Sequence, residues 1–338
     1  MTGWDLLALP QSQADNLSIF EPVAPPSQSI RTLSILLFAI SALIFVVVEG
    51  VLFYNLLRFR KTADAPATEP PQVYGGTPIE IAWTVAPTLI VCILVLVVAR
   101  TLWEIELDPP PPKPGDNALF VSVVGRQWWW EYRYDTYNGR PLGFITANEL
   151  HVPAESDGVP RRVYLDLQSA DVIHSFWVPR LAGKTDLIPG KTNRMWFQTR
   201  ERGTFYGQCA EYCGTQHAGM LLRVIVDSPD EFARWVKLQQ GPAREDPAAR
   251  SGKAAFLAES CVNCHRVRGT SAAGSYAPDL THLMSRLTLA AGILPNNEQN
   301  LDRWVANPQK MKVGCLMPAF AFSEGRRKEI IHYLTTLR

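Results

Sequence analysis

The sequence predicts a three-part fold: a two-helix membrane anchor, an all-β sandwich and a small all-α domain. Two long apolar stretches, 31–57 and 81–103, are each long enough to cross a bilayer. Short alternating or β-branched runs, separated by turn residues, fill residues 118–227. From residue 251 onward the apolar period becomes helical.

The composition excludes several broad classes of protein. A chain of 338 residues is too long for one ordinary core, so we expect two or three domains. The formal net charge is only +1, which argues against a nucleic-acid-binding protein. The six cysteines are too few for a disulfide scaffold, and their clustering favours metal or cofactor ligation.

The membrane anchor is the first element. Arg58, Arg60 and Lys61 directly follow the first apolar stretch. The positive-inside rule therefore places the loop between the two spans in the cytoplasm and both termini outside. We expect a bacterial plasma (inner) membrane protein with periplasmic C-terminal domains. The first 30 residues lack a basic region followed by an apolar one, so no cleaved signal peptide is expected.

The remaining elements follow the anchor in order. A proline-rich connector, DPPPPKPGDN, leads into the β domain, and PDEFARWVKLQQ (229–240) has the pattern of a short amphipathic helix. The segment GPAREDPAAR reads as a flexible linker. The predicted bounds are 1–107 for the N-terminal segment and anchor, 108–228 for the β domain, 229–250 for the helix and linker, and 251–338 for the helical domain.

The helical domain begins with a haem attachment motif. CVNCH (261–265) has the C-x-x-C-H spacing in which Cys261 and Cys264 add to the haem vinyl groups and His265 ligates the iron. A zinc site needs two more ligands at suitable spacing, and a redox dithiol needs a βαβ context; we find neither. Haem c is therefore favoured.

The second axial ligand of this haem is expected to be a methionine. Met317 lies in CLMPAF, where Pro318 ends regular structure and lets the thioether turn inward. Met311 is the second candidate, and Met284 in THLMSRL reads as a core residue on a helix. A His/Met pair raises the haem potential, as acceptance of electrons from a donor cytochrome requires.

The segment YGQCAEYCGTQHAGM (206–220) carries more metal ligands than one ion needs. Its spacing is C-x-x-x-C-x-x-x-H-x-x-M, with Cys209, Cys213, His217 and Met220. A disulfide would leave the histidine and the methionine unused, and a thioether is an unusual zinc ligand. A blue-copper site uses one thiolate, two histidines and an axial methionine. The additional thiolate favours two coppers that share two bridging sulfurs.

Two coppers need a second imidazole from elsewhere in the β domain. His174 in VIHSFWVP follows a β run and precedes an aromatic cluster. A histidine in such surroundings is usually a satisfied core residue. The ligand-rich segment at 209–220 reverses this expectation, and we predict that His174 joins the site.

The two spans, the β domain and this motif together resemble subunit II of haem–copper cytochrome c oxidases, with its dinuclear CuA centre. The resemblance implies a cupredoxin-like Greek-key sandwich. The helical domain resembles class I cytochromes c through CVNCH, APDL (277–280) and RWVANPQKMKVGCLMP, and Pro278 is expected to offer its carbonyl to His265. The chain therefore looks like a subunit II with a fused C-terminal cytochrome c domain.

The resemblance also assigns roles to individual residues. Cys209 and Cys213 would bridge the coppers. His174 and Met220 would complete one copper, and His217 with the Glu211 carbonyl would complete the other. The Glu211 side chain would help to bind Mg²⁺ shared with subunit I.

Two further positions take roles from the family. Trp128, in GRQWWWEYRY, maps onto the residue through which electrons reach CuA. Alternating aromatics in such a run otherwise indicate a packed sheet face. Glu80 maps onto an acid near the mouth of a proton channel, although an acid at a helix start commonly just complements the helix dipole.

The resulting functional hypothesis is a component of a terminal oxidase that is not catalytic alone. Electrons would pass from a donor cytochrome c, or a quinol:cytochrome c reductase, through haem c to CuA and then to subunit I. That subunit would reduce O2 to water with proton pumping, alongside subunit III. The alternatives are the equivalent subunit of a nitric oxide-reducing relative and, in another class, a copper-delivery or thiol-redox protein.

Overall fold

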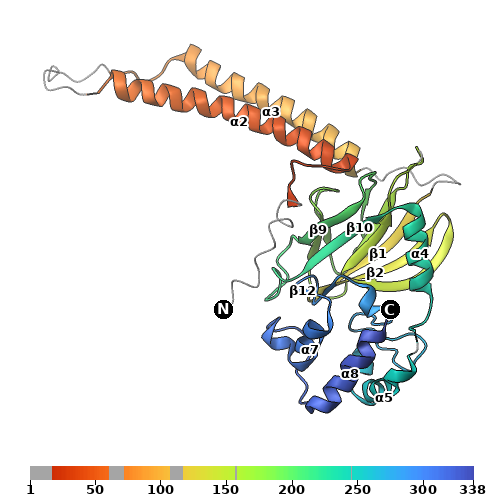
Figure 1. The fold of residues 1–338 in the computed structure, drawn as a ribbon. Coiled ribbons are helices and arrows are strands. Elements are labelled where there is room, and N and C mark those ends of the chain that lie inside the picture. Colours follow the sequence, from red (N-terminus) through yellow and green to blue (C-terminus); the bar gives the residue numbers. More distant parts are fainter. Residues whose placement is uncertain (1–16, 61–71, 107–116, 157, 245) are drawn as a thin grey trace. The chain divides into compact units, whose positions relative to one another are not determined.

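The computed structural model describes residues 17–60, 72–106, 117–156, 158–244 and 246–338 (Figure 1). It divides into two compact units, which we describe separately. One unit comprises residues 28–107 and contains the long helices. The other contains the β domain and the C-terminal helical domain.

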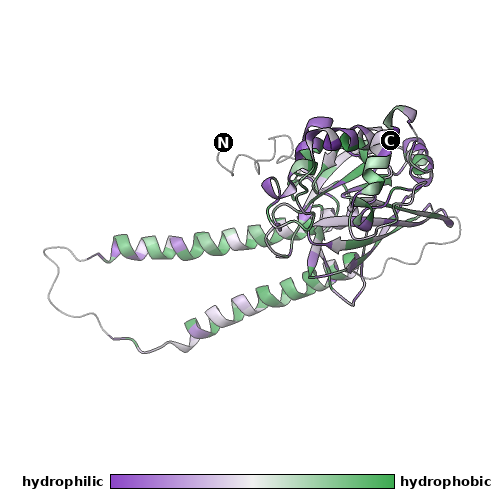
Figure 2. Ribbon diagram, turned by 90° about the horizontal axis from the view of Figure 1, so that it is seen from below, coloured by the Kyte–Doolittle hydropathy of each residue, from purple (hydrophilic) through white to green (hydrophobic). Residues whose placement is uncertain are grey.

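The first unit consists of two long apolar helices, α2 (Pro25–Arg58, which begins in the other unit) and α3 (Thr77–Glu106). Both are long and apolar enough to cross a membrane, with mean hydropathies of 2.8 and 2.7. Figure 2 shows hydrophobic residues along both helices. Each helix extends a few residues beyond the predicted apolar stretch, because flanking polar residues continue the helical hydrogen bonding.

The β domain, which we call the sandwich domain (residues 117–227), contains two five-stranded sheets. The first has the order β3-β2-β1-β5-β8 and the second β4-β10-β9-β6-β7. The strands of the first sheet are β1 (Leu119–Arg126), β2 (Trp129–Tyr137), β3 (Arg140–Ala147), β5 (Val163–Ser169) and β8 (Asn193–Phe197). Those of the second are β4 (Glu149–Pro153), β6 (His174–Trp177), β7 (Thr185–Leu187), β9 (Gly203–Cys209) and β10 (Leu221–Asp227).

Aromatic residues fill the space inside the sandwich. Trp130, Tyr132 and Tyr134 alternate along β2 and are fully buried, as expected for one face of a packed sheet. Phe176 on β6 meets Trp130 edge to face, with ring centroids 5.6 Å apart. This core supports the end of β6, where His174 lies.

The helix predicted at 229–240 is α4 (Pro229–Gln240). Ser228 and Glu231 form a capping box that satisfies N–H groups at its start. Phe232 and Val236 bury their side chains in the sandwich core, and Trp235 packs against it. The helix is therefore attached to the sandwich domain.

The helical domain (residues 249–338) contains α5 (Arg250–Ala258), α6 (Cys261–Cys264), α7 (Glu298–Ala306) and α8 (Glu324–Thr336). Helices α5 and α8 approach closely at Gly252, where an added Cβ would lie 2.1 Å from the carbonyl oxygen of Glu329. Short 3-10 turns accompany these helices: η2 (Pro247–Ala249) directly precedes α5, η3 (Leu283–Ser285) lies between α6 and α7, and η4 (Pro308–Lys310) lies between α7 and α8.

The helical domain differs from the sequence prediction in two places. The helix expected around Met284 is only the turn η3, although Met284 does pack against the apolar core. A small hairpin, β11 (Thr288–Leu289) and β12 (Leu294–Pro295), was not predicted because its strands are too short to show a period.

The segment 241–250, predicted as a flexible linker, makes contacts with the helical domain at two of its described residues. Ala249 is buried in the core of the helical domain and Ala243 packs against it. The Ala243 N–H also donates to the Arg268 carbonyl. Two small apolar side chains of this segment thus pack against the helical domain.

Candidate metal centre and haem attachment site

The candidate metal centre lies at one end of the second sheet, where β6 begins and β9 ends. His174 is the first residue of β6 and Cys209 the last residue of β9. The two strands are antiparallel neighbours with Phe176 opposite Cys209. This pairing places an imidazole beside a thiol contributed by a distant part of the chain.

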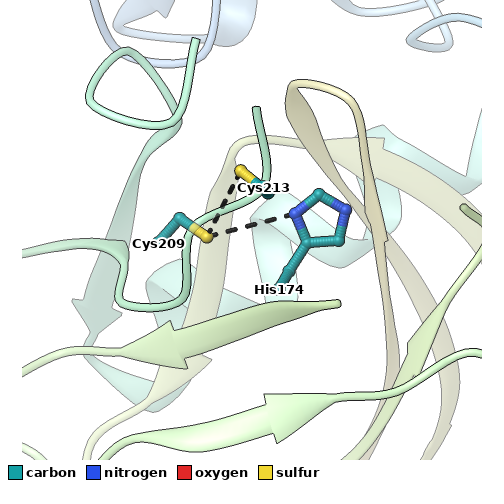
Figure 3. Close-up of side chains that lie close together, drawn as sticks. All are labelled: His174, Cys209 and Cys213. Carbon is teal, nitrogen blue, oxygen red and sulfur yellow. Dashed lines mark hydrogen bonds between the residues drawn. The ribbon is translucent and has the colours of Figure 1, made fainter. Parts of the chain in front are cut away.

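The two thiols face each other without forming a disulfide. Their sulfurs are 3.8 Å apart, whereas a disulfide bond measures about 2.05 Å. The Nδ1 atom of His174 lies 4.0 Å from the Cys209 sulfur. These ligand atoms all lie within 4.8 Å of one another, and the three residues are buried (Figure 3). Such a cluster can hold a metal ion that prefers sulfur and nitrogen ligands.

The 210–220 loop brings the remaining donors to the same thiols. The Nδ1 atom of His217 lies 3.7 Å from the Cys213 sulfur, and the Met220 sulfur lies 3.9 Å from it. The carbonyl oxygen of Glu211 lies 3.2 Å from the Cys209 sulfur. The six residues singled out from the sequence are thus neighbours around one sulfur pair.

The electrostatics of the site favour a thiolate at Cys209. Hydrogen bonding with Cys213 is the main cause of a lowered Cys209 pKa of about 3, and contact with His174 acts in the same direction. Hydrogen bonding with the Cys209 sulfur is the main cause of a raised Cys213 pKa, and burial and repulsion between adjacent thiolates act in the same direction. Cations placed between the sulfurs would relieve this repulsion, which fits a metal-binding pair.

Asp171, which the sequence analysis did not single out, orients His174. Its carboxylate oxygen lies 2.7 Å from Nε2 of His174. Nε2 must carry the proton of this hydrogen bond, so Nδ1 remains free on the side of the thiols. Asp171 also accepts a hydrogen bond from the Gln127 N–H, at 2.7 Å. The sequence offered no signal for this role beyond a spacing of three residues.

Gly125 on β1 was also missed. A Cβ atom at this position would lie 2.8 Å from the His174 ring. The absence of a side chain therefore gives the imidazole its space. Only the alignment of β1 with β6 across the sandwich reveals this requirement.

Trp128 lies next to the candidate centre and is 9% exposed. Its indole N–H donates to the Cys213 carbonyl at 2.9 Å, and the Gln127 side-chain amide donates to the same oxygen at 2.8 Å. Gly214, at a φ of +114°, leaves room for the indole ring. The indole is therefore joined through one hydrogen bond to a residue that carries a candidate ligand.

The haem attachment motif forms the short helix α6 and the residue after it. Cys261 packs against the apolar core, and Cys264 is exposed. The predicted hydrogen bond from His265 Nδ1 to the Pro278 carbonyl is present at 2.8 Å. It fixes the proton on Nδ1 and leaves Nε2 available as an iron ligand. Burial lowers the pKa of His265, which favours the neutral form that binds metals.

The three candidate methionines occupy different surroundings. Met284 and Met311 pack against the apolar core, whereas Met317 does not belong to it. Gln309 donates to the carbonyl oxygens of Cys315 and Met317, at 2.7 and 2.8 Å, and so holds the loop before Pro318. Among the three, Met317 is the one without a role in core packing.

Glu80 and the Glu211 side chain lie outside the metal cluster. Glu80 is in the first turn of α3 and accepts a hydrogen bond from the Gly76 N–H at 3.1 Å. The Glu211 carboxylate is 43% exposed and lies 3.7 Å from the Lys184 ammonium. The Glu80 contact agrees with the simpler interpretation of an acid at a helix start.

Models of known protein families match all three parts of the chain: the apolar helices, the sandwich domain and the helical domain. Residues 13–99 match the family model described as "Cytochrome C oxidase subunit II, transmembrane domain". Residues 119–228 match "Cytochrome C oxidase subunit II, periplasmic domain", and residues 249–338 match "Cytochrome c".

Relatives and solved structures carry the same description. The chain is 36% identical over 327 residues to "Cytochrome c oxidase subunit 2" of Alkalihalophilus pseudofirmus, an alignment that covers 96% of this chain and 92% of the relative. It is 33% identical over 304 residues to the Bacillus subtilis protein of the same name, with 85% and 82% coverage. The solved periplasmic domain of subunit II of cytochrome oxidase from Bradyrhizobium japonicum is 33% identical over 38% of this chain and 96% of that chain, with a TM-score of 0.33.

The first prediction concerns Asp171. Replacement by Ala should lower the copper affinity of the full chain about 10- to 100-fold, because His174 loses the partner that orients it. Titration of the metal-free chain with copper measures this affinity. The variant Asp171→Asn, which keeps an acceptor oxygen, should lose less.

The matched control is Asp186→Ala on the neighbouring strand. The Asp186 carboxylate is 40% exposed and contacts only the Lys184 ammonium, at 3.8 Å, among the described side chains. Its removal should leave copper affinity unchanged. Equal losses in both variants would contradict the orienting role of Asp171.

Proposed function

This chain belongs to the cytochrome c oxidase subunit II family, and on that premise we propose that it relays electrons through its own haem c to a dinuclear copper centre. The family relationship and the fused cytochrome c domain make it part of an oxidoreductase complex with subunit I. The observation that carries the finer proposal is the gathering of two thiols, two imidazoles, a thioether and a carbonyl around one sulfur pair.

The proposed ligand sets divide this donor group between two coppers. Cys209 and Cys213 would bridge both ions. His174 and Met220 would hold one copper, while His217 and the Glu211 carbonyl would hold the other. Burial of both cysteines excludes water from the bridge and limits reorganisation when charge changes.

The helical domain would hold haem c through Cys261, Cys264 and His265, with Met317 as the second axial ligand. Haem c and a dinuclear copper centre each supply reversible one-electron chemistry. The Pro278 carbonyl would keep the His265 ring oriented toward the iron. Trp128 would form the contact through which electrons reach the copper ligands, since its indole hydrogen-bonds to Cys213.

The proposed complex extends beyond this chain. Electrons would leave the copper centre for subunit I, where O2 is reduced to water with proton pumping, with subunit III as a further partner. A donor cytochrome c or a quinol:cytochrome c reductase would supply them. The Glu211 carboxylate is exposed enough to share Mg²⁺ with subunit I, and Glu80 would lie near a proton channel. We place the chain in a bacterial inner membrane, with its C-terminal domains on the periplasmic side.

The metal content of the purified full chain tests this proposal. We expect two coppers for each haem, with a mixed-valence copper signal shared over both ions. A single labile copper without haem would instead favour a copper-delivery protein. Zinc in place of copper would refute the proposed centre.

The second axial ligand has its own test. Met317→Ala should convert the low-spin haem spectrum into that of a haem with a weaker or missing sixth ligand, and should lower the haem potential. Met284→Ala is the matched control, because Met284 packs in the core. An unaltered spectrum in Met317→Ala would assign the ligand to another residue, and Met311→Ala would be examined next.

A further inference from the structure

Lys312 is a buried lysine without a carboxylate partner among the described residues. Its side chain lies in the loop between η4 and Met317 and is 3% exposed. Its ammonium donates to three backbone carbonyls: Trp128 at 2.7 Å, Gly219 at 2.8 Å and Ala290 at 3.1 Å. An ammonium has three N–H donors, and all three are used.

Burying the Lys312 ammonium in this way costs free energy of folding. Lysines are almost never fully buried unless they are paired with an acid. Burial lowers the pKa of Lys312 to about 7, because the charged form loses its hydration. An apolar side chain would avoid this penalty but would leave the three carbonyl oxygens without this donor. The use of an ammonium here therefore points to a positional role.

The three carbonyls come from both sides of a domain boundary. Trp128 and Gly219 belong to the sandwich domain, while Lys312 and Ala290 belong to the helical domain. Trp128 contacts the Cys213 carbonyl through its indole, and Gly219 immediately precedes Met220. Lys312 thus connects the haem-bearing domain to the backbone beside the candidate copper ligands.

A buried acid makes the reciprocal connection. Glu149 on β4 is 2% exposed, and its carboxylate accepts the N–H groups of Leu287 and Thr288, each at 2.8 Å. It also accepts the Thr288 hydroxyl at 2.7 Å. Each domain therefore contributes one buried ionisable side chain that hydrogen-bonds to backbone groups of the other domain. Lys312 binds carbonyls of the sandwich domain, and Glu149 binds N–H groups of the helical domain.

The turn at residues 290–292, next to the contacts of Lys312 and Glu149, has a backbone conformation that lets it lie against the sandwich domain. Ala290 and Ala291 have φ values of 55° and 60°, in the left-handed region that residues with a Cβ rarely adopt. They are followed by Gly292, where an added Cβ would lie 2.8 Å from the Leu221 side chain. The Leu221 N–H donates to the Ala291 carbonyl at 3.1 Å. The hairpin turn thus lies directly against the residues that follow Met220.

We propose that Lys312, with Glu149 as its counterpart, is a positioning residue. Together they fix the helical domain against the part of the sandwich domain that contains Trp128. Electrons then pass from haem c to copper in one docked arrangement, and the domain does not act as a loosely tethered carrier. This inference rests on the proposed function for its electron-transfer part. The docking itself rests only on contacts between described residues.

The test uses Lys312→Met in the full chain within the assembled oxidase. Loss of a charged donor to buried carbonyls should speed hydrogen exchange at the amides of Leu221, Leu287 and Thr288 by about tenfold or more. After rapid photoreduction of haem c, its electron transfer to copper should slow by a similar factor of about ten, because only the docked fraction reacts. Haem and copper spectra and reduction potentials should stay unchanged.

The matched control is Lys310→Met, two residues away and exposed, which should change neither exchange nor rate. If Lys312→Met fails to assemble, Glu149→Gln tests the same docking from the sandwich domain, with slower electron transfer expected. Unchanged amide exchange and rate in the assembled variants would overturn the proposal. So would a slower rate accompanied by shifted potentials, because the lysine would then act through the cofactor sites.

The two proposals fail in distinguishable ways. A wild-type chain without copper and haem would refute the proposed function. The amide-exchange comparison needs neither cofactor, so it still decides whether Lys312 and Glu149 hold the two domains together.

Discussion

The antiparallel pairing of β6 with β9 is the constraint on which the metal centre depends. Phe176 lies opposite Cys209, and the Ala210 N–H donates to the Ser175 carbonyl at 3.0 Å. Because strand side chains alternate between the two faces, a slip of one residue would turn Cys209 away from His174. The sandwich core, the loop that carries the other donors and the space left by neighbouring strands all serve this register. The pairing of β6 with β9 therefore brings the candidate ligands together.

A feature could be predicted from the sequence when the residues that form it lie close together in the chain. The ligand-rich segment and α4 could be predicted because their spacing and periodicity lie within a few turns of chain. His174 could be predicted only because the segment required a second imidazole. Asp171 could not, since its role depends on which nitrogen of His174 faces the thiols. Lys312 could not either, because two of its three carbonyl partners, Trp128 and Gly219, come from the sandwich domain.

Fusion of the cytochrome c domain changes the physical problem that the copper domain faces. A separate donor must find its docking surface by diffusion and pay translational and rotational entropy at each encounter. A covalently attached domain meets the same surface intramolecularly, at a high effective concentration. Here the boundary is also reinforced by two buried charges, Lys312 and Glu149, each bound to backbone groups of the opposite domain. The proposed relay would therefore use rigid placement as well as attachment.

The proposed haem-to-copper relay can be followed directly by a single-electron experiment on the assembled oxidase. One electron is placed rapidly on haem c, and the optical signals of haem c, copper and subunit I are followed in time. We expect haem c to be reoxidised as copper is reduced, electron for electron, before any signal changes in subunit I. Reoxidation of haem c without transient reduction of copper, or a haem that keeps its electron, would contradict it.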